Sequence, residues 1–462
     1  MDIDQREYRV AKQNGRIIHT KINILNFDFQ VVDEISGVVL DGSTYDIDAT
    51  SDIRRTCNIS LIPKDKSFNV EYGGKLWMDK YIQVLIGIED TSNNNEIVYS
   101  NLGLYLINNP DQVYDATNNT ITISGVDLMA KITGLRNGYL GFSDGTQIAT
   151  AYQIPMATGI KQSMTKVINQ LCGFTLYSID QPTPTILTPY DMSFGLGSTA
   201  YNMVAQLRDI NAGYQTYFDQ DGIFWFNPIP TGSNEQIRVD DDIWKKVLIS
   251  YKKTTDFESV KNYIEVFGKT QDDGHTPYGC TYDDNEDSPF NINLNGENQN
   301  IIRIVLSGGE YDNIYPEPIP NTTTVDYNYF EMVTNIQPTD SPKRKRWYIR
   351  SGTSPNYTYT LSNDSSPVSG RTYYKRLFDS LAQQRAEYEL YLRCRLQDQI
   401  ELTCVPVYWL DVNWLIEITL PNKQSGEERP EQYIIKKIST TLGASGTQNI
   451  TLMKYYPLYP WG

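Results

Sequence analysis

The stretch YIIKKISTTLGASGTQNITLMK, residues 433–454, has the pattern of two strands joined by a turn rich in Gly and Ser. A second stretch of the same pattern, YLINNPDQVYDATNNTITISG, occupies residues 105–125. Both begin with Tyr, an aliphatic residue and Ile. Both end close to an Ile-Thr pair, which is Ile121-Thr122 in the first and Ile450-Thr451 in the second. The chain therefore contains two similar hairpins that are far apart in sequence.

The similarity extends one strand upstream of each hairpin. The segments MDKYIQVLIGI and LDVNWLIEITLP each contain an aliphatic residue, then Asp79 or Asp411, and then an aromatic residue that leads an alternating run. A three-strand unit in the same order at both ends predicts two related β domains on either side of the central region.

Length and composition limit the class of protein. A chain of 462 residues is long enough for two to four domains, each with its own core. A net charge of −16 excludes a broad nucleic-acid-binding surface, because phosphate binding needs clustered Lys and Arg. The polar N-terminus is not a signal peptide and no apolar run is long enough to span a bilayer, which predicts a soluble protein made in a cytoplasm.

The strand and helix patterns divide the chain into three blocks. Residues 1–134 are rich in alternating strands, and we expect a first antiparallel β domain there. Residues 135–235 contain two helical patterns and a hairpin with an Asp221-Gly222 turn, which predicts an α+β middle domain. Residues 236–462 predict a second β domain, interrupted at about 270–370 by an acidic stretch rich in Pro, Gly and Asn that is too long for a loop.

Each helical pattern in the middle block predicts a buried face. The first helix ends at Gly173, and Ser198 is the expected N-cap of the second. The expected faces are formed by Met164, Val167, Ile168 and Leu171 in the first helix and by Tyr201, Val204, Ala205 and Leu207 in the second.

Residues that commonly carry chemistry are few. The two histidines, His19 in an alternating run and His275 in a Gly/Pro loop, lack the sequence context of a nucleophile–histidine enzyme or a metallopeptidase. Five cysteines are scattered without a Cys-x-x-Cys pair, which predicts reduced thiols rather than disulfides or a zinc site. We expect no catalytic, cofactor-binding or metal-binding residues.

Three further motifs have simple structural explanations. The segment GLGSTA, residues 195–200, matches a dinucleotide fingerprint, but we interpret it as a turn that enters a helix. The acidic runs 240–242 and 283–287 lack the spacing of a calcium loop and predict solvated loops. The basic run KRKRW, residues 343–347, predicts an exposed loop beside an acidic neighbour.

The order of four segments resembles the hub proteins of tailed-phage tails and baseplates, a family related to the T-even baseplate hub and to the N-terminal part of tail-associated lysins. The segments are SDIRRTCNISL, NLGLYLI with TITISGVDLMAKI, INAGYQTYFDQDGIFWFNPIP, and SLAQQRAEYEL with IELTCVPVYWLDVNWLIEI. The resemblance covers most of residues 15–455, and 270–370 matches poorly. It implies two tail-tube-like antiparallel β-barrel or sandwich domains flanking a helix-containing insert.

The resemblance also implies a function. Members form homotrimers, so three chains present six similar barrels to a sixfold tail tube. We therefore predict a non-enzymatic tail-tip or baseplate hub in the virion, assembled in the host cytoplasm, that contacts the distal tail-tube ring, the tape measure protein, and tip, spike or peripheral baseplate proteins. Genomic DNA would pass through its lumen without specific binding, repelled by acidic residues if part of the charge lines the channel.

One alternative stays open from the sequence. Tyr (34) outnumbers Phe (14) and Trp (7) together, which is typical of protein interfaces and of sugar-binding surfaces alike. Carboxylate pairs cannot be recognised before folding. A carbohydrate-binding surface β protein or a glycosidase is therefore the second hypothesis.

Overall fold

The computed structural model describes residues 4–456 with internal gaps. These gaps are 37–40, 63–67, 69, 115–118, 141–151, 183–184, 233–234, 271–273, 293–303, 306–310, 312–329, 335–346, 354–355, 365–366, 422–427 and 444. The basic residues Lys343–Arg346 and most of the 270–370 stretch thus lie outside the described residues.

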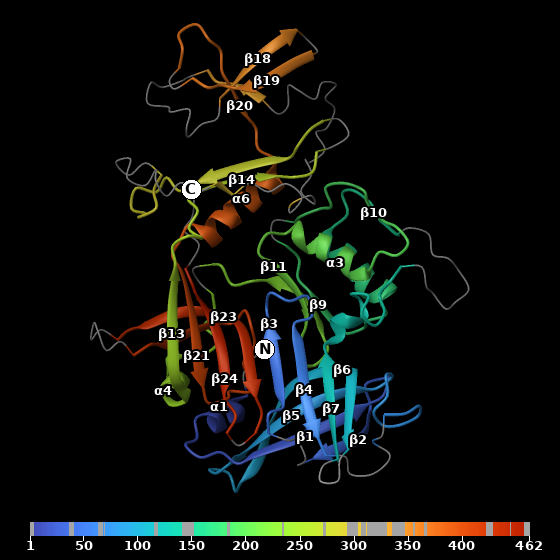
Figure 1. Ribbon diagram of the computed structural model, residues 1–462. Helices are drawn as coiled ribbons and strands as arrows, with labels where there is room; N and C mark the ends of the chain where they lie inside the picture. Colours follow the sequence, from blue (N-terminus) through green and yellow to red (C-terminus); the bar gives the residue numbers. More distant parts are fainter. Residues whose placement is uncertain are drawn as a thin grey trace.

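The fold is mainly β, with 43% strand and 15% helix, and its sheets are largely antiparallel, which confirms the predicted fold class. Twelve strands form one sheet across the lower part of the molecule (Figure 1). These strands are β1 (Ile18–Leu25), β2 (Val31–Ser36), β3 (Thr44–Asp48), β4 (Arg55–Leu61), β5 (Tyr81–Asp90), β6 (Glu96–Tyr114), β7 (Asn119–Val126), β13 (Leu248–Asp256), β21 (Gln397–Cys404), β22 (Leu415–Thr419), β23 (Pro430–Thr441) and β24 (Gln448–Lys454).

The twelve-stranded sheet contains the same five-strand arrangement twice. The first unit has the order β3-β4-β7-β6-β5, and the second has the order β13-β21-β24-β23-β22. All pairs within both units are antiparallel. The repeat inferred from three strands therefore covers five. The first unit carries β1 and β2 in addition, beyond β5.

The register of the two hairpins shows which residues correspond. In the first, Leu106 lies opposite Val126, and a bulge follows between Ile107 and Asn109. In the second, Ile434 lies opposite Met453, and a bulge follows between Ile435 and Lys437. The Tyr-aliphatic-Ile triplets thus superpose as the sequence predicts.

The Ile-Thr pairs do not superpose. When Val126 is matched with Met453, Ile450 corresponds to Ile123 rather than to Ile121. The two-residue offset keeps the same side chains in the core, because residues two apart on a strand share a face. Alternation alone therefore does not distinguish the two alignments.

The two units share one hydrophobic core. A single cluster of buried residues takes in strands of both units together with helices α1 (Gln5–Ala11) and α4 (Asp241–Val247). Among the described strands, the sheet is an open path with β13 and β2 at its ends, and neither unit closes into a barrel. Where the sequence predicts barrel or sandwich domains, the chain has two open antiparallel sheets that are fused side by side.

The other face of the sheet is polar. Along β4, Cys57 and Ile59 are buried, whereas the alternate residues Thr56, Asn58 and Ser60 are at least partly exposed. The same alternation continues through the second unit. The partly or fully exposed residues of this open face include Thr44, Asp46, Thr56, Asn58, Ser60, Thr122, Ser124, Lys252, Thr254, Glu401, Thr403, Lys437, Ser439, Asn449 and Thr451.

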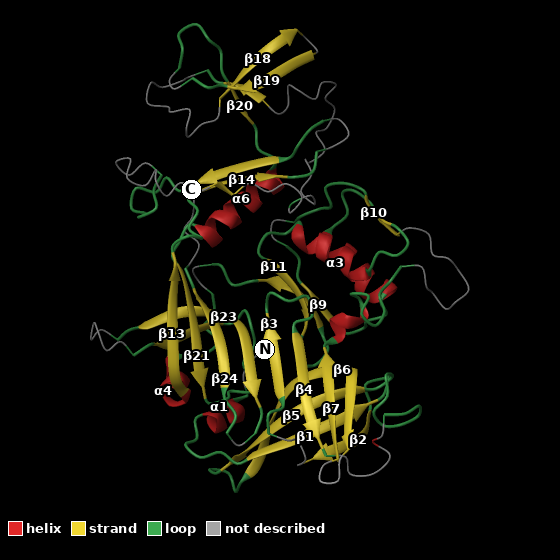
Figure 2. Ribbon diagram, in the orientation of Figure 1, coloured by secondary structure: helices red, strands yellow, loops and turns green. Residues whose placement is uncertain are grey.

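The middle region packs its helices onto a second core (Figure 2). Its elements are η2 (Leu128–Lys131), β8 (Tyr152–Ile154), α2 (Ile160–Thr165), the π-helical segment η3 (Lys166–Leu171), β9 (Tyr177–Ile179), β10 (Met192–Phe194), α3 (Ala200–Asp209), β11 (Tyr214–Phe218) and β12 (Phe224–Pro228). The predicted hairpin forms from β11 and β12, with Gly222 at φ +77° in its turn.

Two details of the helix predictions are wrong. The N-cap of α3 is Thr199 rather than Ser198, and it forms a capping box with Asn202. Leu171 is exposed, because the helix changes to π-helical geometry from Lys166 and rotates this side chain off the buried face. On α3 the fully buried residues include Met203, Val204 and Leu207, whereas Tyr201 is only partly buried.

The remaining elements lie beyond the upper ends of the long strands (Figure 2). Helix α6 (Ser380–Arg393) packs against β14 (Tyr263–Phe267) and β15 (Tyr278–Tyr282), and β16 (Ile304–Val305) extends this sheet. A separate four-stranded sheet consists of β17 (Phe330–Met332), β18 (Trp347–Thr353), β19 (Asn356–Leu361) and β20 (Tyr374–Arg376). In the described part of the chain, no helix has the length and apolar character needed to cross a bilayer.

Substitution of Gln448 tests how the two units pack against each other. The Nε2 of this fully buried amide bonds to Tyr45 Oη of the first unit (3.3 Å), and to Thr440 Oγ1 (3.0 Å) and the Val407 carbonyl (3.2 Å) of the second. Its Oε1 accepts from Val407 N–H (3.1 Å). Gln448→Leu leaves these groups unpaired, so we expect the free energy of unfolding to fall by about 2–4 kcal/mol in chemical denaturation. The matched control Asn449→Ala, on the open face, should change it by less than about 0.5 kcal/mol. Equal effects would contradict the role given to Gln448.

Candidate functional site

The two units are joined by direct pairing of strand β3 with strand β23. Residues 44–48 of β3 run antiparallel to residues 437–441 of β23, with Ile47 opposite Ile438. Backbone bonds continue the ladder at both ends, from Ala49 N–H to the Lys436 carbonyl (2.9 Å) and from Leu442 N–H to the Ser43 carbonyl (2.7 Å). A salt bridge of 3.2 Å between Asp48 and Lys437 lies across it. We call this contact the β3–β23 joint.

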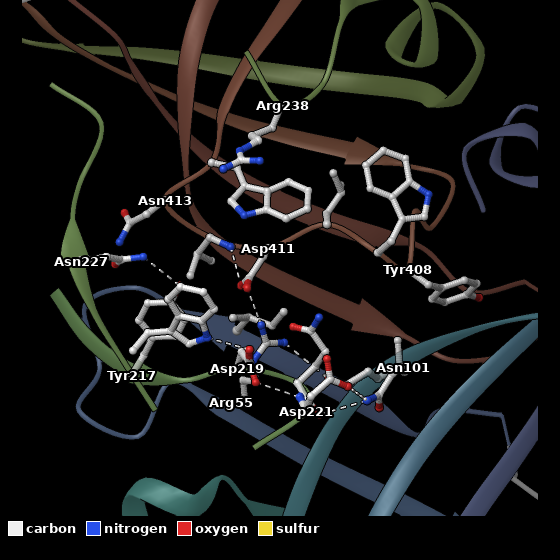
Figure 3. Close-up of a pocket in the computed structure, with 18 of the residues that line it drawn as sticks. Arg55, Asn101, Tyr217, Asp219, Asp221, Asn227, Arg238, Tyr408, Asp411 and Asn413 are labelled. Atoms are coloured by element: carbon white, nitrogen blue, oxygen red, sulfur yellow. Dashed lines mark hydrogen bonds and ion pairs between the residues drawn. The ribbon is translucent and has the colours of Figure 1, made fainter. Parts of the chain in front are cut away.

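A buried ion pair lies beside the joint. Arg55 Nη2 donates to Asp411 Oδ2 at 2.6 Å, and both side chains are nearly inaccessible (Figure 3). Arg55 begins β4 in the first unit, whereas Asp411 precedes β22 in the second. The pair therefore fixes the two units to each other in a place where an unpaired charge is costly.

The hairpin of the middle region completes the junction. Gln215 Oε1 accepts hydrogen bonds from Arg54 Nη2 (2.7 Å) and from Asn413 Nδ2 (2.6 Å), so one amide connects all three parts of the chain. The Arg54 guanidinium also lies over the Tyr217 ring, 3.9 Å from its centroid. On the other side, Asn101 Nδ2 donates to Asp221 Oδ1 at 2.8 Å (Figure 3).

A cavity of about 440 Å³ opens at this junction. Its lining combines carboxylates, amides and aromatic rings, which include Tyr217, Asp219, Trp225, Asn227, Arg238, Tyr408, Trp409, Asp411 and Trp414 (Figure 3). This mixture is what a saccharide site would need, so the cavity is the place to examine the glycosidase hypothesis.

The carboxylates of the cavity are engaged in structural contacts. Burial raises the pKa of Asp219, as expected for a general acid. However, Asp219 accepts from the Trp225 indole N–H (2.7 Å) and from the N–H groups of Asp221 and Ile223, which holds its hairpin turn. Asp411 is bound by Arg55 and by the N–H of Val412. These contacts favour a structural junction over a catalytic pair.

The histidines lie in separate structural settings. His19 is on β1, as predicted, with Nε2 at 2.8 Å from Glu89 Oε1 on the neighbouring strand. His275 is buried, with Nε2 at 3.1 Å from Asp379, the residue that precedes α6. Asp379 also accepts from the Tyr278 N–H at 2.8 Å. His19 lies in the large sheet and His275 in the loop before β15, so the structure does not bring them together.

The other motifs serve local structure. In GLGSTA, Gly197 has φ +85° in the turn and Thr199 caps α3. Asp240 caps α4, and Asp241 binds Thr419 and Lys245. Trp347, at the end of the basic run, is buried against Tyr373. Across the described residues, no group of three or more His, Cys, Asp or Glu side chains is placed to hold a metal ion.

At each end of the large sheet, at β13 and at β2, one edge has no other described strand paired with it. Strand β13 ends the sheet, and only β21 pairs with it among the described strands. Strand β6 pairs with β5 up to Leu106 and with β7 from Leu106 onward. The outer half of β6, residues 109–113, therefore has β7 on one side and no described strand on the other. The edges of β13 and β2 are places where a further strand can pair.

Known proteins are similar to this chain in fold. The 43 kDa tail protein of prophage MuSo2 from Shewanella oneidensis matches with a TM-score of 0.52 over 95% of this chain and 98% of that one, at 9% identity. The tail protein of Neisseria meningitidis MC58 matches with a TM-score of 0.51 over 94% and 96%, at 8% identity. The chain has the fold of a phage tail protein. The resemblance stated from the sequence is thus confirmed at the level of fold.

Similarity at the level of sequence gives less information about this chain than similarity of fold. Residues 353–459 match a family described as "Domain of unknown function (DUF5048)", which covers β19 to β24 of this chain. No protein with a curated description matches the sequence.

Most of this junction leaves little signal in the sequence. Asp411 was noticed only as a marker of the repeat, and neither Arg55 nor Gln215 was singled out. The adjacent charges Arg54-Arg55, at the start of a strand that is otherwise apolar on alternate positions, are the signal that indicates a buried cation.

The Arg55–Asp411 pair gives a second stability test. Arg55→Met leaves Asp411 buried and unpaired, so the free energy of unfolding should fall by about 3–5 kcal/mol in chemical denaturation. The double variant Arg55→Met/Asp411→Asn removes the charge but keeps an oxygen for the Val412 N–H, and it should recover most of this loss. A double variant no more stable than Arg55→Met would contradict a buried ion pair at the junction.

Proposed function

We propose that this protein is a structural hub of a phage tail, a homotrimeric ring that joins the tail tube to the distal tip. The observation that carries the proposal is the five-strand unit that occurs twice in one chain and is fused edge to edge through the β3–β23 joint. Two such units per chain convert a threefold assembly into six similar positions. That number matches the sixfold tail tube that the hub resemblance implies.

The sheet has one face suited to a channel. Helices α1 and α4 cover the core face, which leaves the open polar face to line the lumen. This face is rich in hydroxyl and amide groups, some of which bond to one another, as Ser60 does with Thr122 (2.9 Å). Its acidic residues include Asp48 and Glu401, which lie opposite Lys437 (3.2 Å) and Lys252 (3.8 Å).

A largely neutral lining changes the expected role of charge. Three chains carry a net charge of three times −16, or −48. On the open face, however, acidic and basic side chains nearly balance each other. DNA sliding past hydroxyl groups finds no cluster of Lys or Arg that would retain phosphates. We therefore assign the nonspecific passage of DNA to a neutral wall rather than to acidic repulsion.

The parts outside the sheet would contact other tail proteins. We assign residues 1–134 and 236–462 to the two ring-forming domains and residues 135–235 to the middle domain. The middle domain and the 270–370 insertion would meet tip, spike or peripheral baseplate proteins, and the ring would meet the tail tube and the tape measure protein. The location is then the virion, after assembly in the host cytoplasm, and the role is non-enzymatic.

The molecular mass of the purified protein tests the ring. Three chains of 52.8 kDa give three times that value, or about 158 kDa, in mass photometry or light scattering. We expect this species, with dissociation at low concentration and without tail partners. A monomer of 52.8 kDa at every concentration, particularly one that binds glycans, would contradict the ring and favour the carbohydrate-binding alternative.

A further inference from the structure

We propose that the junction cavity is the docking site for an arginine side chain of a partner protein in the tail. The proposal names the chemistry of one partner contact and rests on the proposed function for the kind of partner. The cavity has a volume of about 440 Å³ and is lined by all three parts of the chain that meet at the junction (Figure 3). This volume is in the range of pockets that hold a ligand.

The cavity lies on the side of the sheet away from the open polar face. Its walls include Tyr45 and Ile47, which are buried core-face residues of β3, and Glu7 of helix α1. Because the proposed hub turns the open polar face to the lumen, the cavity would face the outside of the ring. A peripheral tail protein can reach it there.

Acidic side chains outnumber basic ones among the described residues that line the cavity. The six acidic residues are Asp4, Glu7, Asp219, Asp221, Glu235 and Asp411, and the two basic residues are Arg55 and Arg238. Arg55 is already paired with Asp411 at 2.6 Å. The lining therefore carries an excess of negative charge.

Neutral donors, rather than cations, bond to three of these carboxylates. The Trp225 indole N–H donates to Asp219 (2.7 Å), Asn101 Nδ2 donates to Asp221 (2.8 Å), and the N–H of Gly232 donates to Glu235 (3.2 Å). Such bonds orient a carboxylate but leave its charge in place. A cationic group can still be attracted to all three.

The ionisation of the site favours a cation over an anion. Burial raises the pKa of Glu7 and of Asp219, and the nearby carboxylates of Asp4 and Asp221 raise it further. A positive charge in the cavity would relieve this repulsion, whereas a phosphate or another anion would increase it. Anionic ligands are thus excluded on electrostatic grounds.

Aromatic rings line the same cavity. Three of the seven tryptophans, Trp225, Trp409 and Trp414, are on its wall, and all three are partly exposed. The ring centroids of Trp409 and Trp414 are 6.4 Å apart, and the hydrogen bond to Asp219 holds the Trp225 indole. The rings are therefore ordered before a ligand binds, which lowers the entropic cost of binding.

An arginine side chain suits both features of the lining. Its planar guanidinium stacks on aromatic rings and forms paired hydrogen bonds with carboxylates. The chain uses the same arrangement on one wall, where the Arg54 guanidinium lies 3.9 Å from the ring centroid of Tyr217. A neutral saccharide would stack on the rings but leave the carboxylate charges uncompensated. Arginine is also one of the residues that most often anchor protein interfaces.

A pair of small ligands tests the site in the whole protein. The probe is Nα-acetylarginine amide, and its control is Nα-acetylcitrulline amide, which has nearly the same shape but a neutral urea in place of the guanidinium. Saturation-transfer NMR and tryptophan fluorescence report binding. We expect the arginine derivative to bind about tenfold more tightly than the citrulline derivative.

Variants at the mouth of the cavity locate the binding. The double variant Glu235→Gln/Asp221→Asn removes two charges and keeps the oxygens that accept from Gly232 and Asn101. The affinity for the arginine derivative should fall about tenfold. The matched control Asp111→Asn/Glu258→Gln removes two charges from exposed residues outside the cavity, and the affinity should change by less than about twofold.

Three results would overturn the arginine site. The first is that the arginine derivative does not bind, and the second is that the citrulline derivative binds equally well. The third is that the cavity variant and the control variant have the same effect, which would place the binding elsewhere. Glucose, measured in the same way, would favour the carbohydrate-binding alternative if it bound where the arginine derivative did not.

The mass of the same sample by light scattering reports the ring separately. A trimer that does not bind the arginine derivative would overturn the cavity proposal and leave the ring standing. A monomer that binds the derivative in the cavity would overturn the ring and leave the arginine site standing. A monomer without binding would overturn both.

Discussion

Backbone N–H and C=O groups along a strand edge require hydrogen-bond partners. In the β3–β23 joint, the edge strand of one unit provides these partners for the edge strand of the other. The joint makes one sheet and one core from two similar units. The same repeat leaves one strand edge without an equivalent partner. Strand β13 is the counterpart of β3 in the second unit, and among the described strands it pairs only with β21. The arrangement of the molecule, from the buried Arg55–Asp411 pair to the junction cavity, follows from this one strand pairing.

Much of the fold was predictable from hydrophobic period and turn residues. The hairpins at residues 105–125 and 433–454 and the Asp221-Gly222 turn all form where the sequence indicates. These features depend on local patterns, and Tyr105 and Tyr433 hold equivalent buried positions because the same triplet precedes the same bulge. The Ile-Thr alignment failed by two residues because a period of two cannot distinguish such shifts.

The junction was less predictable for a physical reason. Edge pairing uses backbone groups that every residue has, so the joint between Thr44–Asp48 and residues 437–441 leaves almost no mark in side-chain pattern. The ion pair joins residues 356 positions apart, and Gln215 links three segments through a single oxygen. Leu171 and Ser198 were misplaced by smaller effects, a π-helical segment and a cap one residue later. Long-range partners of this kind become visible only after folding.

The repeat is the basis of the account of function, so the ring itself is its most direct test. Cryo-electron microscopy of the purified assembly, or of the tail, would show its symmetry and its inner wall. The account predicts a threefold ring whose five-strand units follow one another at six similar positions, with the Thr, Ser and Asn side chains of the open face pointing into the channel. Two results would contradict this account. One is a closed ring in which the first and second five-strand units do not alternate around a single axis, and the other is a ring in which the core face of the sheet points into the lumen.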